Sequence, residues 1–151
     1  MDLLNPDTHI PWVTFEAKEW LDGYLRKNMA VCEWGTGGST LYYAKHAGRV
    51  TSVEHNPEWH QAVQSALRHE QIGNCDYFLI LPQPHGLARH LPYGPHTYVS
   101  RTFDEHKGFF FWKYVRKIDE FPDGHFDLVM VDGRSRAACM HHDVRKIKKG
   151  G

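Results

Sequence analysis

The sequence predicts an α/β fold, a doubly wound and mainly parallel sheet with helices on both faces. Strand-sized apolar segments alternate along the chain with segments of helical periodicity, which is typical of this class. Segment 126–131 is nearly all apolar, as expected for a strand buried on both faces. The chain of 151 residues has the size of one domain, so we assign residues 1–151 to a single unit.

The first half of the chain should contain three helices and two strands. We expect a helix from Thr14 to about Lys27, a strand at 29–34, a helix at 40–47, a strand at 49–54 and a helix from Pro57 to about Glu70. Thr14 and Asn56 can cap the two longer helices, because their side-chain oxygens accept bonds from first-turn N–H groups. Pro57 fits a first helical turn, and Gly48 ends the short helix.

The second half should alternate in the same way around one long loop. We expect a strand at 76–81, a loop at 82–104, a helix at 105–120, a strand at 126–131 and a helix at 135–148. Residues 82–104 carry four prolines and no clear period, and such loops are usually lids or mobile segments. Phe110, Tyr114 and Ile118 share one face of the expected helix.

The end of the sequence predicts a sheet that is incomplete on its C-terminal side. In a doubly wound sheet another strand should follow the last helix, and the sequence stops at Gly151 instead. Strand 126–131 would then be an apolar edge, which is a liability for a soluble protein. Either the chain is a fragment, or a partner chain or a second copy in a homodimer covers that edge.

Composition excludes several classes of function. The 18 basic and 18 acidic side chains balance, so we expect neither nucleic acid nor a membrane surface as a partner. No apolar segment is long enough to span a bilayer, and the N-terminus lacks the pattern of a signal peptide. Three widely spaced cysteines suit reduced thiols and a cytoplasmic location. The 12 histidines are scattered, so we predict no metal site.

Residues 30–40 form the most informative segment, Ala-Val-Cys-Glu-Trp-Gly-Thr-Gly-Gly-Ser-Thr. A short apolar strand meets Glu33, and a glycine-rich turn then leads into a helix. We interpret the glycines as positions where a ligand approaches the backbone. A second acid, Glu54, ends the next apolar segment 21 residues after Glu33. A glycine turn followed by such an acid is typical of nucleoside cofactor sites, because a carboxylate can accept bonds from both ribose hydroxyls.

These motifs resemble those of the class I S-adenosylmethionine-dependent methyltransferases that act on small molecules. The resemblance covers Glu33–Thr40, Val53–Trp59 and Phe126–Arg136. The closing Lys-Lys-Gly-Gly resembles the bend that leads into the fifth strand of that family. The resemblance implies a Rossmann-like fold, S-adenosylmethionine as the cofactor, and in-line transfer of its methyl group to a small-molecule acceptor.

The resemblance also assigns residues to the methionine half of the cofactor. Glu33, Gly35 and Gly37 would line this half. Gly38 and Ser39 would offer backbone N–H groups at a helix start, where the partial positive charge favours the methionine carboxylate.

Two acids complete the implied site. Glu54 would hold the ribose, and Asp132 would lie beside the sulfonium and the acceptor, as the first candidate for a catalytic base. The acid that often follows the third strand of the family is absent, since Leu81-Pro82-Gln83-Pro84 stands there. Segments after the fifth strand, which often shape the acceptor pocket, are missing too.

Other interpretations stay open. The chain could bind the nucleoside without transferring a methyl group, or it could be half of an NAD-dependent oxidoreductase. The third glycine of a dinucleotide motif would fall at Thr40, and Glu54 would repel the phosphate of NADP. Asp132 could merely cap a turn with Gly133. Arg134 and Arg136 could bind an acidic acceptor or be solvated residues at a helix start.

Overall fold

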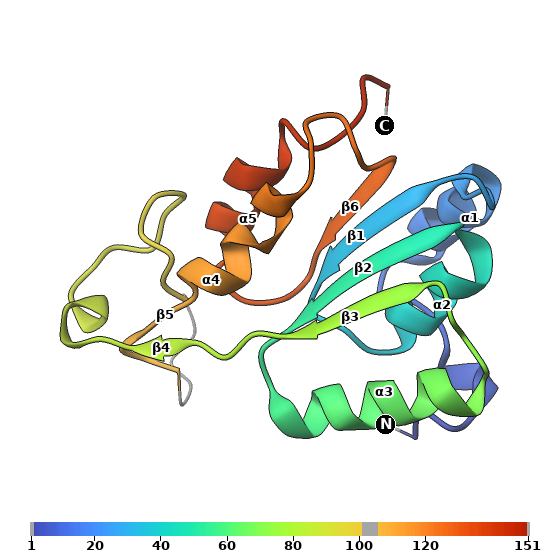
Figure 1. Ribbon diagram of the computed structural model, residues 1–151, viewed down its shortest axis with the longest axis horizontal. Coiled ribbons are helices and arrows are strands. Elements are labelled where there is room, and N and C mark those ends of the chain that lie inside the picture. Colours follow the sequence, from blue (N-terminus) through green and yellow to red (C-terminus); the bar gives the residue numbers. More distant parts are fainter. Residues whose placement is uncertain (1, 101–105, 151) are drawn as a thin grey trace.

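The computed structural model describes residues 2–100 and 106–150, and its centre is a sheet of four parallel strands (Figure 1). The strands are β1 (Ala30–Trp34), β2 (Arg49–Glu54), β3 (Cys75–Leu79) and β6 (Leu128–Val131). They lie in the order β3-β2-β1-β6, and every pairing is parallel. The predicted parallel α/β sheet is therefore confirmed, and β3 and β6 are its two edge strands.

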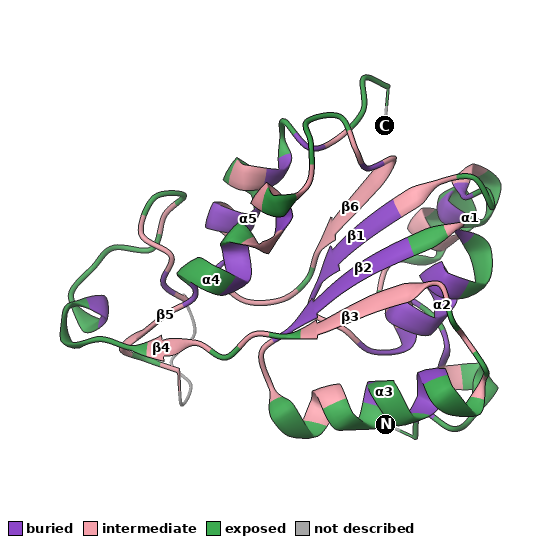
Figure 2. Cartoon of the chain, in the orientation of Figure 1, coloured by how far each residue is buried: buried purple, intermediate pink, exposed green. Residues whose placement is uncertain are grey.

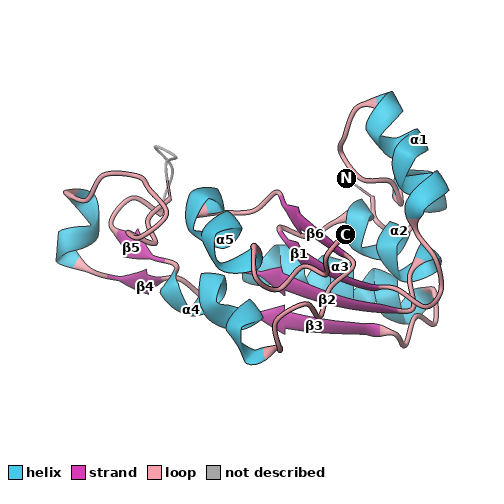
Figure 3. Cartoon of the chain, turned by 90° about the horizontal axis from the view of Figure 1, so that it is seen from above, coloured by secondary structure: helices cyan, strands magenta, loops and turns pink. Residues whose placement is uncertain are grey.

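Helices cover both faces of this sheet (Figure 3). The helices are α1 (Phe15–Tyr24), α2 (Gly38–His46), α3 (Pro57–His69), α4 (Trp112–Val115) and α5 (Arg136–Asp143). Short 3₁₀ turns occur at η1 (Pro6–Thr8), η2 (Gly86–Arg89) and η3 (Arg116–Glu120). The elements α1, α2 and α3 lie on one face, while α4, η3 and α5 lie on the other, as a doubly wound fold requires.

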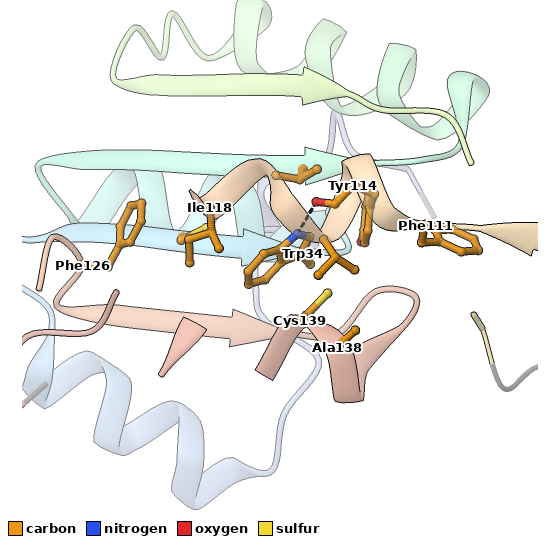
Figure 4. Close-up of a cluster of buried hydrophobic side chains, with 10 residues drawn as sticks. Trp34, Phe111, Tyr114, Ile118, Phe126, Ala138 and Cys139 are labelled. Carbon is orange, nitrogen blue, oxygen red and sulfur yellow. Dashed lines mark hydrogen bonds between the residues drawn. The ribbon is translucent and has the colours of Figure 1, made fainter. Parts of the chain in front are cut away.

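The alternation of side chains along β1 divides the core into two layers. Val31 packs toward α1 and α2, whereas Cys32 and Trp34 pack toward α4, η3 and α5. In the second layer the Trp34 indole nitrogen donates a 3.0 Å hydrogen bond to the carbonyl of Tyr114 (Figure 4). The central strands β1 and β2 are the most deeply buried, and β6 is only half-buried along its length (Figure 2).

The predicted helix starts are confirmed by their caps. The Thr14 side chain accepts a bond from the N–H of Ala17, and the Asn56 side chain accepts one from the N–H of Trp59. The end of the first helix was placed three residues too late. The backbone becomes extended at Leu25, which is 5% exposed and packs into the core instead of continuing the helix.

The prediction for residues 82–120 was wrong in part. Strand β4 (Gln83–Pro84) lies within the expected loop and pairs antiparallel with β5 (Phe109–Phe110), which lies within the expected helix. Gly108 precedes β5 at a φ of +95°, a value that an α-helix does not contain. Within the segment predicted as a helix, helical structure begins only at α4. Residues 101–105, which belong to these two predictions, lie outside the described residues.

The last helix is also shorter than predicted, because the chain turns back to pair with the segment just before β6. After α5, Ile147 forms a parallel bridge with Phe126, and the N–H of Lys148 donates a 2.8 Å bond to the Phe126 carbonyl. The Lys148 ammonium lies 2.8 Å from the Asp127 carboxylate. The bridge thus pairs a residue just before β6, and a partner chain along the edge of β6 stays a prediction.

Candidate functional site

The carboxyl ends of β1, β2 and β6 meet around a cavity of about 720 Å³. It is lined by residues 10–13 before α1, the glycine loop 35–39, residues 54–56 at the end of β2 and residues 130–134 at the end of β6. Six of the seven predicted site residues line this cavity, namely Gly35, Gly37, Gly38, Ser39, Glu54 and Asp132. They converge because parallel strands place their carboxyl ends at one edge of the sheet.

Glu33 is the exception, since it lies beneath the cavity and does not line it. Its carboxylate is fully buried and accepts bonds from the hydroxyls of Ser39, at 2.9 Å, and Ser52, at 2.7 Å. Burial raises the pKa of Glu33 to about 7, against the opposing hydrogen bonds of Thr40, Ser52 and Ser39. Glu33 therefore ties the start of α2 to the sheet and carries only part of a negative charge near neutral pH.

Glu54 faces the cavity, but four donors already hold its carboxylate. Oε1 accepts from the backbone N–H groups of His55 and Asn56, and Oε2 accepts from the N–H and the hydroxyl of Thr36. Burial alone raises the pKa of Glu54, but the contact with His55 and these hydrogen bonds bring it down to about 2. Glu54 thus joins the glycine loop to the turn after β2. The Thr36 hydroxyl has a second partner, the Tyr77 hydroxyl at 2.7 Å, so it could release Glu54 to a ligand.

The glycines of the loop differ in what approaches them. A Cβ on Gly35, whose φ is +83°, would lie 2.6 Å from the backbone nitrogen of Gly133. A Cβ on Gly38 would lie 2.0 Å from the carbonyl oxygen of Thr8. Only Gly37 leaves ordinary space, with the Trp59 ring 3.4 Å away. At Gly35 and Gly38 the protein's own backbone therefore makes a close approach that excludes a side chain. Since both glycines also line the cavity, the interpretation of the glycines as ligand contacts stays a prediction.

Asp132 lies at the mouth of the cavity and is paired with an arginine. Its carboxylate is 2.8 Å from the guanidinium of Arg136, and both side chains are about half exposed. Arg136 also donates to the carbonyls of Asp132 and Gly133. Arg136 is thus held by the turn after β6 and does not extend freely into solvent. Both arginines that the sequence singled out, Arg134 and Arg136, line the cavity.

Tyr43 is a cavity residue that sequence reasoning missed. It lies on α2, one helical turn after Ser39, and its side chain is 0% exposed. The residue lines the cavity, and its buried hydroxyl has no hydrogen-bond partner among residues 2–100 and 106–150. Burial and the nearby Glu33 carboxylate raise the pKa of this phenol, so it stays protonated. The spacing of four residues from Ser39 was the available signal, because such residues share a helix face.

Aromatic residues form much of the remaining wall. Trp12 lines the cavity with 89% of its surface exposed, and Trp59 donates its indole N–H to the Thr36 carbonyl. His55 and His106 stand together at a ring distance of 5.0 Å. Nothing in their spacing along the sequence indicated that they would meet.

Two further observations concern metals and membranes. Within the described ranges, no three His, Cys, Asp or Glu side chains gather closely enough to bind a metal ion. None of the helices described is both long and apolar enough to cross a bilayer.

Comparison with solved structures identifies similar folds. The precorrin 8W decarboxylase of Methanobacterium thermoautotrophicum aligns with a TM-score of 0.54 at 22% identity, over 97% of this chain and 64% of that one. The tRNA (m1A58) methyltransferase TrmI of Aquifex aeolicus aligns with a TM-score of 0.54 at 19% identity, over 92% and 45%. The YcgJ protein of Bacillus subtilis aligns with a TM-score of 0.50 at 16% identity, over 85% and 43%.

These similarities show that the chain has a class I methyltransferase-like, Rossmann-like fold. The chain spans less than two thirds of the length of each of the three proteins. No protein-family model and no curated protein matches the sequence. Since one neighbour is named as a decarboxylase and another as a methyltransferase, the fold does not determine the reaction.

Proposed function

We propose that the cavity binds S-adenosylmethionine and that the chain transfers its methyl group to a small-molecule acceptor. The observation that carries this proposal is the convergence of the glycine loop, Glu54 and Asp132 around one cavity at the carboxyl ends of β1, β2 and β6. The free thiols of the three cysteines support a cytoplasmic location.

The charges around the cavity fit a zwitterionic amino acid. The N-terminus of α2 directs the backbone N–H groups of Gly38 and Ser39 toward the cavity side and favours a carboxylate. Glu33 beneath the loop and Asp132 at the mouth favour a positively charged group between them. The methionine half of the proposed cofactor carries a carboxylate, an ammonium and a sulfonium. The pyrophosphate of NAD carries only negative charge and would face the same two acids, which disfavours it.

The ribose would bind beside Glu54 and Thr36. The Glu54 carboxylate can accept a ribose hydroxyl once the Thr36 hydroxyl turns to its second partner, Tyr77. Asn56 and Trp59 line the cavity next to Glu54 and would bound the nucleoside.

The chemistry asks the protein chiefly for positioning. A sulfonium methyl is already a strong electrophile, so transfer is an in-line displacement governed by the placement of the acceptor. Trp12 and the glycine loop would exclude water from the reacting atoms. Asp132 could accept a proton from an oxygen or nitrogen acceptor after its carboxylate moves away from Arg136.

The acceptor side of the cavity carries both charge and aromatic surface. Arg134, Arg136 and the exposed ring of Trp12 would suit a small acceptor with a negative charge and an apolar part. The balanced composition of the whole chain supports a small molecule over a nucleic acid. TrmI, named for its action on tRNA, makes a nucleic-acid acceptor a case that experiment must test.

Calorimetry with S-adenosylhomocysteine and with NAD tests the cofactor. Binding of the first and not the second supports the proposal, and the reverse result favours half of an oxidoreductase. Release of S-adenosylhomocysteine in a panel of small acceptors and tRNA then identifies the acceptor class. Binding without turnover on the whole panel would favour a nucleoside-binding module. Light scattering tests whether a second copy covers the outer side of β6, and a monomer would contradict that idea.

A further inference from the structure

The hydroxyl of Tyr43 is a buried polar group that the fold leaves without a partner. The residue is 0% exposed, and no hydrogen bond to its hydroxyl occurs within the described part of the chain. Leaving such a group buried and unpaired is destabilising, so proteins seldom keep one without a use. Its ring is part of the core layer under α2, where a phenylalanine would fill the same space.

The position of this hydroxyl relates it to the start of α2. Helical side chains lean toward the N-terminus of their helix, so Tyr43 reaches back past Ser39 toward the first turn. Both residues line the cavity, together with Gly38 and Asp132. Two independent features therefore belong to the lining of one cavity, a helix start with N–H donors and a residue whose buried hydroxyl is unpaired.

The chemistry of the two features selects a ligand group. A protonated phenol donates one hydrogen bond, and the helix start supplies N–H donors, so together they suit a carboxylate. A neutral hydroxymethyl or methylthio group would not supply the negatively charged acceptor that the helix N–H groups favour. A phosphate would meet the acids Glu33 and Asp132 with additional negative charge.

We propose that Tyr43 is the residue by which this cavity recognises the amino-acid end of its nucleoside ligand. The inference rests on the proposed function and adds a specificity-determining residue to that site. Tyr43 donates to the methionine carboxylate beside the first turn of α2. It distinguishes S-adenosylmethionine and S-adenosylhomocysteine from nucleosides that lack the amino acid.

The test compares two neighbouring tyrosines of the same helix. Tyr43→Phe removes the unpaired hydroxyl, while Tyr42→Phe removes a hydroxyl that donates to the Asp22 carboxylate at 2.5 Å outside the cavity. Affinities for S-adenosylhomocysteine and for 5′-methylthioadenosine, which lacks the amino-acid end, are measured by calorimetry on the full chain. Stability is measured by urea unfolding of each variant.

We expect Tyr43→Phe to lower the affinity for S-adenosylhomocysteine by roughly 10-fold to 100-fold, because a hydrogen bond to a charged group is lost. Its affinity for 5′-methylthioadenosine and its urea midpoint should not fall. Tyr42→Phe should show the opposite pattern, with a lower midpoint and unchanged affinity for both ligands.

Three results would overturn the inference, and the last of them is distinguishable from the first two. If the wild-type chain binds S-adenosylhomocysteine but Tyr43→Phe binds it equally well, Tyr43 does not contact the amino-acid end and the proposed function stands. An equal loss of affinity for both ligands in Tyr43→Phe would also show that Tyr43 does not recognise the amino-acid end. If the wild-type chain binds neither ligand, the proposed function itself is overturned.

Discussion

Gly35 and Gly133 pack backbone against backbone, so closely that a Cβ on Gly35 would lie 2.6 Å from the nitrogen of Gly133. The contact joins the turn after β1 to the turn after β6 and sets the separation of the glycine loop from Asp132. It depends on the positive φ of Gly35 as well as on its missing side chain.

Gly35→Ala should therefore lower the free energy of unfolding by at least about 2 kcal/mol, because it combines backbone strain with a clash. Gly37→Ala is the matched control, since its Cβ would meet only the Trp59 ring at 3.4 Å. Gly37→Ala should fold normally and differ from wild type chiefly in ligand affinity. Urea unfolding distinguishes the two, and equal loss of stability in both variants would contradict the assignment.

Glu54 should make the fold sensitive to acid. Its folded pKa of about 2 lies below the unfolded value near 4.5, so its stabilisation is present above pH 4.5 and is lost as the pH falls toward 2. Glu54→Gln should cost roughly 2–3 kcal/mol at pH 7 and about 1 kcal/mol less at pH 4. Urea unfolding at both values measures this. Glu58→Gln, an exposed acid in the first turn of α3, is the control with little effect at either pH. If Glu54→Gln lowered the free energy of unfolding equally at both pH values, the stabilisation would not come from the ionised Glu54 carboxylate.

Glu33 should act in the opposite direction. Its folded pKa of about 7 lies above the unfolded value near 4.5, so full stability is present below pH 4.5 and part is lost as the pH rises toward 7. Glu33→Gln should be about 1–3 kcal/mol more stable than wild type at pH 8 and nearly equal to it at pH 4.5. Thermal unfolding across this range checks the prediction, and a variant less stable at pH 8 would show that the charged form is favoured.

Asp132 should affect turnover more than binding. If it accepts the proton of the acceptor, Asp132→Asn should reduce the rate of methyl transfer by about 100-fold or more. The affinity for S-adenosylhomocysteine should change less than about threefold, because Asp132 is half exposed and this ligand lacks the positive sulfonium that Asp132 is proposed to face. Arg136→Gln tests the pairing, and its stability should change by less than about 1 kcal/mol. Unchanged turnover in Asp132→Asn would restrict Asp132 to capping the turn with Gly133.

Trp12 should contribute to acceptor binding and little to folding. It lines the cavity while 89% exposed, so Trp12→Ala should change the free energy of unfolding by less than about 0.5 kcal/mol. We expect a higher KM for the acceptor with little change in cofactor affinity. Phe15→Ala is the control, because Phe15 is 77% exposed and lies outside the cavity lining. Equal effects of both substitutions on KM would contradict a role for Trp12 in the site.

Local chemistry explains what could be predicted from the sequence. The caps Thr14 and Asn56 act within their own helical turns, so their side-chain types were sufficient evidence. The position of Glu54 and Asp132 at strand ends followed from the apolar segments before them. Parallel pairing then placed both acids at one edge of the sheet without any knowledge of side-chain contacts.

Contacts between distant parts of the chain explain what could not be predicted. Strands β4 and β5 pair across 25 residues, and the aromatic pattern of residues 109–118 fits a helix as well as a strand followed by a helix. The pairing of Gly35 with Gly133, and of Gly38 with the Thr8 carbonyl, depends on segments that no local motif relates. From the sequence Tyr43 resembles an ordinary core residue, and only the structure places it beside the cavity.

The contacts of Trp59 supply a built-in optical probe. Its indole donates to the carbonyl of Thr36, and its ring packs over Gly37, so its surroundings change with the glycine loop. Of the five tryptophans in the chain, only Trp12 and Trp59 line the cavity, the first 89% exposed and the second partly buried. Intrinsic fluorescence can therefore follow occupancy of the cavity in real time, without a label, and the two emitters can be separated by replacing one of them.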